Sequence, residues 1–174
     1  MMNQNIGMDE EEKIAEMLKS IQIELSTEKG KQKVFLNGQD VTDKIRSKEV
    51  SANVSPVSSI KQVRLAMGGL QRKMAQGKDV IMEGRDIGTV IFPNADVKIY
   101  LDANVEVRAK RRVKQNEEKG IEMSYEEVLE NIKKRDKNDM EKEMGALKVA
   151  EDAVVIDGSE MTIKEVEKAI SNVI

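Results

Sequence analysis

Three short apolar segments alternate with helix-forming segments in the second half of this 174-residue chain, and this alternation limits the possible folds more than any other feature. The segments are residues 80–82 (VIM), 97–101 (VKIYL) and 153–157 (AVVID). Each has the length and apolar character of a buried strand. Strands that alternate with helices indicate a layer of parallel strands covered by helices. We therefore expect an α/β fold.

Helix-start and helix-stop signals occupy the residues around these strands. Asp102 and Asn104 are candidate N-caps of a long charged helix over residues 105–119, which Gly120 closes. The following helix is predicted to run through Arg135. Two capping boxes, in which a Ser or Thr precedes a Glu by three residues, open this helix and the last one: Ser124 with Glu127, and Thr162 with Glu165.

The first half of the chain has a different pattern. Residues 9–18 (DEEEKIAEML) are typical of a short amphipathic helix with an acidic first turn. Residues 21–41 contain two apolar stretches and the turn signal Asn37-Gly38, which predict a small antiparallel sheet. Residues 42–59 are polar and irregular. A helix with Gly77 just beyond its end then carries one apolar stripe, formed by Ile60, Val63, Met67, Leu70 and Met74.

The residue types that are absent exclude several kinds of chemistry. The chain has no Cys and no His, so disulfides, thiolate zinc sites and Ser-His or Cys-His nucleophiles are ruled out. Arg, Lys and carboxylates remain, and these side chains serve phosphate recognition, where positioning and charge stabilisation do most of the catalysis.

Composition also sets expectations for location and partners. No apolar run approaches the ~20 residues that a membrane-spanning helix needs, and the acidic start lacks the features of a signal peptide. We therefore expect a cytoplasmic protein with no membrane partner. The net charge of −3, with two Tyr, two Phe and no Trp, does not favour a nucleic-acid partner.

The residues that carry chemistry gather in one constellation. Residues 84–101 (GRDIGTVIFPNADVKIYL) begin with Arg85-Asp86, Val63-Arg64 lies upstream, and residues 133–139 (KKRDKND) lie downstream. Open α/β sheets bind ligands beyond the carboxyl ends of their strands, and Arg85-Asp86 follows the first predicted strand. A guanidinium matches two phosphate oxygens, and a carboxylate accepts from an exocyclic amine such as cytosine N4. Taken alone, a Gly-Arg-Asp turn is more often an ordinary surface turn.

The wider pattern resembles the cytidylate kinase family over nearly the whole chain. The matching segments keep their order and have compatible spacing. They are Asn37-Gly-x-Asp40-Val-Thr, Ile45-Arg-Ser, Glu49-Val-Ser, Val54-Ser55, Val63-Arg64, Gln71-Arg72, Glu83-Gly-Arg-Asp-Ile-Gly-Thr89, Phe92-Pro93-x-Ala95, Lys98-Ile, Arg108-Ala-x-Arg-Arg112, Arg135-Asp-x-x-Asp139 and Ala150-Glu-Asp-Ala153.

This resemblance implies a substrate-binding role for several residues. Arg85 matches a residue that grips the CMP phosphate, and Arg135 and Asp139 match residues that hold the sugar and organise the phosphates; we take these three as the catalytic residues. The residues that match the family's cytosine contacts are Ser55, Arg64 and Asp86.

The same resemblance implies a lid and one weakened phosphate contact. Arg111 and Arg112 match a lid helix that closes over the ATP phosphates; the alternative for this pair is a solvated basic helix face. Lys142 completes the expected CMP-binding set, although it stands where the family usually has Arg. A Lys binds phosphate as a point charge and lacks the bidentate fork of Arg.

The implied fold is that of a P-loop nucleoside monophosphate kinase, with a parallel sheet, flanking helices and a small antiparallel CMP-binding insert. Residues 1–20 would supply a core helix, residues 21–59 the insert, and residues 60–174 the kinase core with its lid around 105–135. The implied activity is transfer of the γ-phosphate of Mg-ATP to CMP or dCMP, with no metal held by the protein itself.

One family feature has no counterpart in residues 1–174. The family begins with a strand and a loop of the form G-x-x-x-x-G-K-[ST], whose backbone amides cradle phosphates. Residues 76–79 (QGKD) are the nearest segment, but Asp79 stands where the hydroxyl belongs and Arg72 where the first Gly belongs. We therefore expect that the first strand and the P-loop are missing.

Two consequences are expected from this departure. Without the first strand, the edges of two neighbouring strands are left unpaired, so we expect a chain that is unstable alone, pairs its strands abnormally, or is completed by a separate N-terminal segment. Three functions stay open: a cytidylate kinase, an inactive remnant that only binds CMP, and a purely structural partner. The intact family suggests a monomer, whereas this chain could self-associate abnormally.

Overall fold

The computed structural model describes the backbone of residues 1–174 and every side chain except that of Lys48. The chain forms two compact units, residues 1–80 and residues 81–174, and each is described by itself. The predicted domains, residues 1–20, 21–59 and 60–174, have boundaries that differ from this one, and the predicted division stays a prediction.

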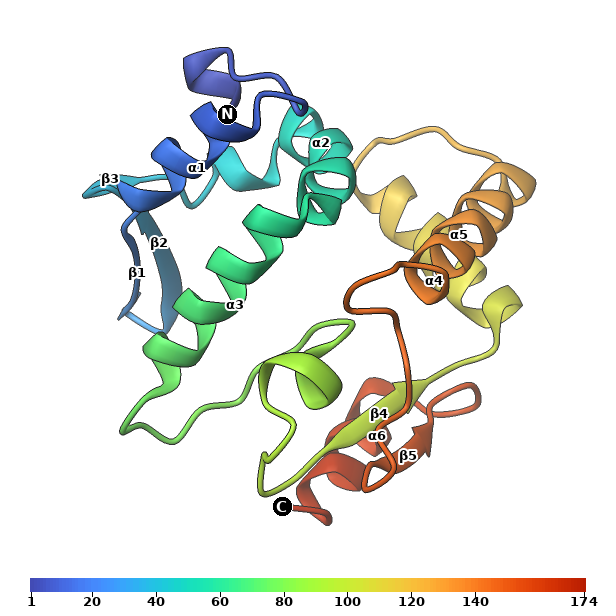
Figure 1. Cartoon of the computed structure of the whole chain (residues 1–174). Helices are drawn as coiled ribbons and strands as arrows, with labels where there is room; N and C mark the ends of the chain where they lie inside the picture. The colour runs from blue at the N-terminus through green and yellow to red at the C-terminus, as the bar shows by residue number, and fades with distance from the viewer. The chain divides into compact units, whose positions relative to one another are not determined.

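The first unit combines three α-helices and two short 3-10 turns with a small antiparallel sheet (Figure 1). Its elements are η1 (Met2–Gln4), α1 (Glu11–Lys19), β1 (Ile23–Glu28), β2 (Lys31–Leu36), β3 (Gln39–Asp40), η2 (Lys44–Arg46), α2 (Lys48–Ser59) and α3 (Lys61–Ala75). The strands pair in the order β1-β2-β3, with Ile23 opposite Leu36 and Phe35 opposite Asp40. The antiparallel sheet expected over residues 21–41 is therefore confirmed.

Tight turns fix the register of this sheet. Asn37 and Gly38 join β2 to β3 with φ angles of 49° and 77°, the left-handed conformation of a two-residue hairpin turn. The Asn37 side chain also accepts a 2.7 Å hydrogen bond from the backbone N–H of Gln22, which ties the turn to the start of β1. Beside the sheet, α1 and α3 bury Ile14 and Val63.

The prediction that residues 42–59 are irregular is wrong, because α2 occupies most of them. Ser47 begins this helix by accepting a hydrogen bond from Val50 N–H, and Pro56 lies inside it. A Pro removes one intrahelical hydrogen bond and normally ends a helix. Here the cap at Ser47 and the packing of α2 against α3 outweigh that local preference.

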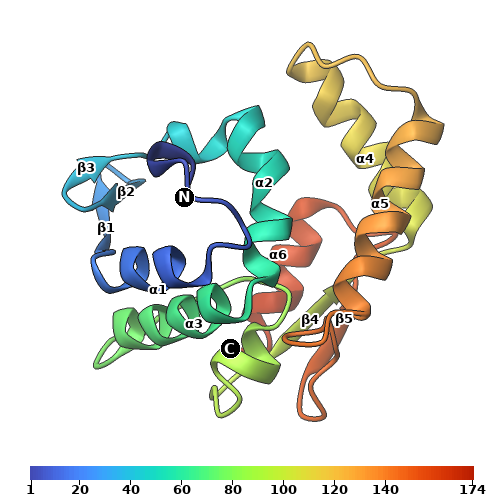
Figure 2. The same cartoon turned by 45° about the horizontal axis from the view of Figure 1, so that its top comes forward.

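The second unit is an α/β layer built on two parallel strands (Figures 1 and 2). Its elements are the single π-helical turn η3 (Ile87–Ile91), β4 (Ile99–Asp102), α4 (Val105–Glu118), α5 (Tyr125–Met140), β5 (Val154–Asp157) and α6 (Ile163–Ser171). Ile99 pairs with Val154 and Asp102 with Asp157 in parallel register. In both views α4 and α5 lie side by side, and α6 packs beside β5. The expected α/β fold is confirmed.

The capping signals of this unit act as predicted. Ser124 accepts from Glu127 N–H while the Glu127 side chain accepts from Ser124 N–H, and Thr162 and Glu165 form the same reciprocal pair. Asn104 rather than Asp102 caps α4. The helix that begins after Ser124 runs five residues beyond the predicted end, to Met140.

The strand predicted over residues 80–82 does not form. These residues make no ladder with any described strand, and Ile81 is 94% exposed. A short apolar run becomes a strand only when a neighbouring strand satisfies its N–H and C=O groups. Arg85 and Asp86 therefore follow an irregular segment and lead directly into η3.

No helix among the described residues has both the length and the apolar character needed to span a membrane.

Candidate functional site

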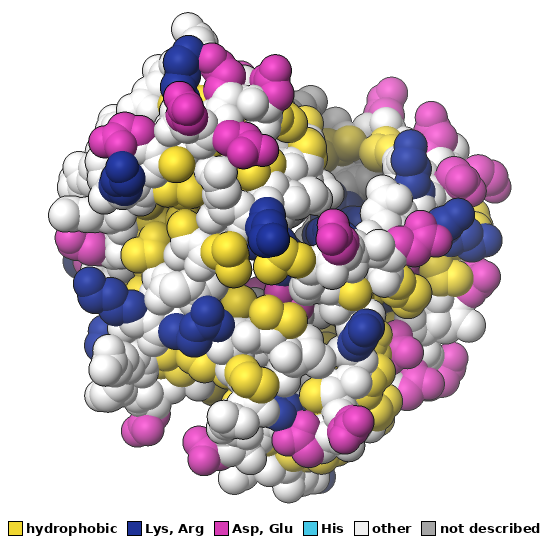
Figure 3. All heavy atoms as spheres, viewed as in Figure 1, with side chains coloured by type: hydrophobic (Ala, Val, Ile, Leu, Met, Phe, Trp, Pro, Cys, Tyr) yellow, Lys and Arg dark blue, Asp and Glu magenta, His cyan; other side chains and the backbone are white. Residues whose placement is uncertain are grey.

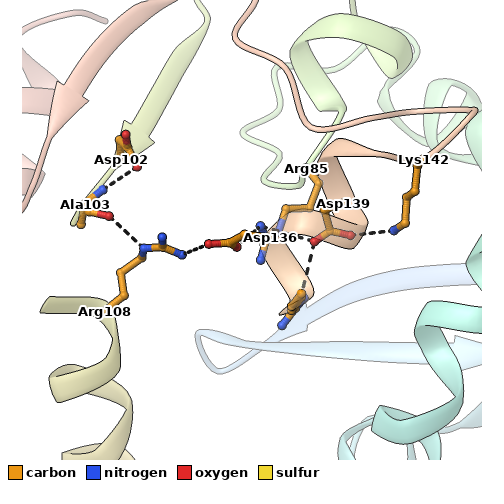
Figure 4. Close-up of polar contacts among 8 residues, drawn as sticks. Arg85, Asp102, Ala103, Arg108, Asp136, Asp139 and Lys142 are labelled. Carbon is orange, nitrogen blue, oxygen red and sulfur yellow. Dashed lines mark hydrogen bonds and ion pairs between the residues drawn. The ribbon is translucent and has the colours of Figure 1, made fainter. Parts of the chain in front are cut away.

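Asp139 lies at the centre of a cationic cluster in the second unit (Figure 4). It occupies the last turn of α5 and is 5% exposed. Its Oδ1 accepts a 2.7 Å hydrogen bond from Lys142 Nζ. Its Oδ2 lies 3.4 Å from Nη1 of Arg85 and 3.8 Å from Nε of Arg135. The structure thus brings together four predicted residues: Arg85, Arg135, Asp139 and Lys142.

A second carboxylate, that of Asp136, extends the cluster toward β4. Its Oδ1 accepts a 3.3 Å hydrogen bond from Nη1 of Arg85, and its Oδ2 accepts a 2.6 Å hydrogen bond from Nη1 of Arg108. Arg108 in turn donates from Nε to the carbonyl oxygen of Ala103, just beyond β4. Asp136 and Arg108 lie in segments that resemble the family, but the sequence alone predicts no role for either.

Helix geometry explains why the two carboxylates meet the same arginine. Asp136 and Asp139 are three residues apart on α5, so they lie on one face of the helix. Both carboxylates lie on regular helix because α5 continues beyond its predicted end at Arg135 to Met140. Arg85 reaches them from the bend that precedes η3.

The charge balance of the cluster suits a phosphate dianion. Four cationic side chains surround two carboxylates, which leaves a net charge of +2. A buried carboxylate is stable when cations and hydrogen bonds compensate it. Oδ2 of Asp139 is buried without a hydrogen bond, and the two guanidinium groups near it supply electrostatic compensation only. The cluster therefore holds its arginines close while keeping an excess of positive charge.

The predicted lid arginines take different positions on α4. Nη2 of Arg111 donates to the carbonyl oxygens of Gly158, Ser159 and Met161, at 2.6, 3.3 and 3.1 Å, in the segment after β5. Nη1 of Arg112 donates to the side chain of Gln115 at 2.6 Å on the same helix. Arg111 is therefore tied to the end of the sheet, whereas Arg112 lies on the helix surface.

A cavity of about 220 Å³ lies at the carboxyl ends of the two parallel strands. Its lining combines two arginines with the strand ends: Leu101, Asp102, Ala103, Arg108, Arg111, Gly158 and Val166. This is the place where open α/β sheets bind ligands. Arg108 both lines this cavity and contacts Asp136, so it links the cavity to the cationic cluster.

A larger cavity, of about 640 Å³, lies where α4 connects to α5. Its lining includes Glu117, Glu122 and Glu127 and contains no Lys or Arg. An acidic lining repels phosphate, so its size does not make this cavity the candidate site for a nucleotide.

The predicted cytosine contacts lie in both units. Ser55 is in α2 and Arg64 in α3, where Arg64 Nη1 donates to the carbonyl oxygen of Ser58 at 3.5 Å. Asp86 is half-buried and immediately precedes η3, and its carbonyl oxygen accepts from the N–H groups of Val90 and Ile91 at the end of that turn. Ser55 and Arg64 belong to the first unit and Asp86 to the second. That the three form one cytosine site therefore stays a prediction.

Among the residues that the structure describes, no group of three or more Asp, Glu, His or Cys could hold a metal ion.

Comparison with known proteins gives a consistent result. The cytidylate kinase family model matches residues 1–174. A cytidylate kinase of Caldicellulosiruptor bescii is 49% identical over 162 residues, which cover 93% of this chain and 72% of that protein. A cytidylate kinase of Bacillus subtilis is 47% identical over 169 residues, which cover 97% of this chain and 75% of that protein.

Proposed function

Because the chain belongs to the cytidylate kinase family, we propose that it transfers the γ-phosphoryl group of ATP to CMP or dCMP. The products are ADP and CDP or dCDP. The observation that supports this activity in the molecule itself is the cluster around Asp136 and Asp139, with its net charge of +2. A nucleoside monophosphate carries a phosphate dianion of matching charge.

In the proposed reaction, one oxygen of the CMP phosphate attacks the γ-phosphorus of ATP. The bond from that phosphorus to the bridging oxygen of ADP breaks in line with the attack. The transition state spreads negative charge over the phosphoryl oxygens, so fixed cations lower the barrier without a His base. Mg²⁺ bound to the ATP co-substrate would supply further neutralisation of charge on its phosphates.

Arg85 and Arg135 are the groups that we assign to the phosphates. The Arg85 side chain is 39% exposed and that of Arg135 is 70% exposed, so both reach solvent while one end stays near Asp139. Asp139 itself is buried among cations, and we assign it the role of organising them. Its contact with the sugar, like the phosphate contact of Lys142, stays a prediction.

Cytosine selection is assigned to Ser55, Arg64 and Asp86. A carboxylate accepts from the cytosine N4 amine, whereas uracil presents the acceptor O4 at that position and offers the carboxylate no hydrogen bond. Arg111, Arg112 and the cavity at the strand ends are assigned to ATP. Closure of α4 and α5 as a lid would exclude water from the reaction.

A coupled assay of ADP release with CMP, UMP or AMP tests the activity. We expect turnover with CMP and dCMP and much slower turnover with UMP and AMP. In parallel, calorimetric titration should give CMP binding that Asp86→Ala weakens by about tenfold or more, while UMP binding changes little. Equal binding of CMP and UMP by the unaltered protein would refute the assignment of cytosine selection.

A second candidate function is CMP binding without turnover. The observation that favours it is that residues 1–174 contain no G-x-x-x-x-G-K-[ST] segment. In that case the titration would show CMP binding while ADP release stays at background. Addition of a separate polypeptide that carries such a loop would then test whether ADP release rises above background.

We also propose a cytoplasmic location, CMP or dCMP and ATP as partners, and no nucleic-acid or membrane partner. On the face shown in Figure 3, cationic and acidic side chains are interspersed, and no broad patch of one sign is visible. Nucleic-acid-binding surfaces instead concentrate Lys and Arg. The family suggests a monomer, and abnormal self-association of this chain is the alternative; sedimentation velocity would distinguish the two.

A further inference from the structure

From the geometry of the cluster we infer that Asp136 is a positioning residue, which fixes Arg85 for the substrate phosphate by anchoring it, through Arg108, to the end of β4. The inference rests on the proposed function, because it assigns a purpose to the phosphate contact of Arg85. It goes further by naming a carboxylate that touches no substrate and by giving the path through which it acts.

Asp136 uses its two oxygens for two different arginines (Figure 4). Oδ1 holds Arg85 at 3.3 Å and Oδ2 holds Arg108 at 2.6 Å. Its side chain is 15% exposed, so solvent competes little for these bonds. A short charge-assisted hydrogen bond at one oxygen restricts the carboxylate and thereby defines where the other oxygen lies.

Arg108 is itself fixed at both ends of its guanidinium. Its Nε donates to the carbonyl oxygen of Ala103 at 2.8 Å, while its Nη1 donates to Asp136. Ala103 follows directly on β4, and its own N–H is held by Oδ1 of Asp102 at 2.8 Å. An unbroken path of hydrogen bonds therefore leads from the strand end to Arg85.

The path of hydrogen bonds engages only one nitrogen of the Arg85 guanidinium among the described side chains. The hydrogen bond and the ion pairs that Arg85 makes with other described side chains use Nη1, where Asp136 and Asp139 meet it. Its Nη2 and Nε therefore remain as donors for phosphate oxygens, in the fork that suits an oxyanion. Asp139 alone would hold Arg85 less directionally, since its Oδ2 makes no hydrogen bond.

The test compares two ligands that differ only in the phosphate. Calorimetric titration of the full chain with CMP and with cytidine measures how much the phosphate contributes to binding. Asp136→Asn should weaken CMP binding by about tenfold, since a misplaced arginine loses much of its phosphate contact. Cytidine binding should stay within about twofold. A general loss of structure would instead weaken both ligands.

Glu130→Gln is the matched control, because Glu130 is an exposed carboxylate on the same helix. It makes the same change of charge without touching the cluster and should leave both affinities within about twofold. If Asp136→Asn loses cooperative unfolding, Arg108→Gln replaces it, since this change cuts the path while Asp136 stays in place. A loss selective for CMP supports the inference in either variant.

The outcomes separate this inference from the proposed function. If the unaltered chain binds CMP no better than cytidine, the result refutes both the positioning role and the proposed function. If it prefers CMP, and Asp136→Asn or Arg108→Gln keeps that preference or weakens both ligands equally, the positioning role is overturned while the proposed function stands.

Discussion

Nζ of Lys142 donates a 2.7 Å hydrogen bond to Oδ1 of Asp139, three residues earlier in the chain. Both side chains are largely buried, with 18% and 7% of their areas exposed. The bond closes the cluster on the side away from Arg85 and gives Lys142 a structural role in addition to its predicted phosphate contact.

Replacement of Lys142 by Met should lower the free energy of unfolding by about 1 to 3 kcal/mol, because the buried Asp139 carboxylate loses its one side-chain hydrogen bond. Met keeps the aliphatic stem, so the change isolates the charge. Urea denaturation measures the effect. Lys137→Met is the control, since Lys137 pairs with Glu141 at 3.9 Å on the surface. It should cost less than about 0.5 kcal/mol, and equal costs would contradict the role given to Lys142.

Replacement of Lys142 by Arg should strengthen CMP binding by a few-fold, because a guanidinium can keep the contact with Asp139 and still offer a second N–H to phosphate. Cytidine binding should not change. Titration with both ligands measures the difference, and an unchanged or weakened CMP affinity would show that Lys142 does not reach the phosphate.

Acid should weaken the helix caps of α5 and α6. Hydrogen bonds from the Ser124 and Thr162 backbones lower the pKa of Glu127 and of Glu165 below the ordinary value of 4.5. A lowered pKa means that the folded state favours the carboxylate. The cap contribution is therefore full above pH 4.5 and is lost as the pH falls through the folded-state pKa.

Urea unfolding at several pH values measures this effect in the unaltered chain and in Glu127→Gln. The variant should be less stable above pH 4.5, and the two curves should converge at lower pH. Curves that stay parallel through this range would rule out the cap as their cause.

Two glycines should respond to Ala with opposite signs. Gly38 has a φ of 77°, so Gly38→Ala forces a side chain into the left-handed region and should cost about 1 kcal/mol. Gly69 lies inside α3 with open space around the position of a Cβ. Gly69→Ala should therefore stabilise the protein by about 0.5 to 1 kcal/mol. Thermal unfolding of both variants checks the signs.

Local signals were the most successful part of the sequence-based prediction. The turn at Asn37-Gly38, the cap at Asn104 and the capping boxes of α5 and α6 need only neighbouring residues, and the structure has all of them. Features that depend on distant partners were missed. Residues 80–82 have the composition of a strand but find no ladder partner in the described structure, and α2 forms despite Pro56.

The cluster shows the same division between local and distant information. The family resemblance implied substrate-binding roles for Arg85, Arg135 and Asp139, and the structure brings these three side chains together. The role of Asp136 could not be derived from spacing, since it depends on Arg108, which is 28 residues away in sequence and lies on another helix. Only the folded geometry pairs these two side chains.

Asp139 lies one residue before the end of α5 at Met140. Helix ends open more often than helix centres, so fraying of this last turn would release Arg85, Arg135 and Lys142 together. A bound phosphate would hold the same cations from the opposite side. Ligand binding and the local stability of this helix end are thereby coupled, so amide protons in the final turn of α5 should exchange more slowly when CMP is present.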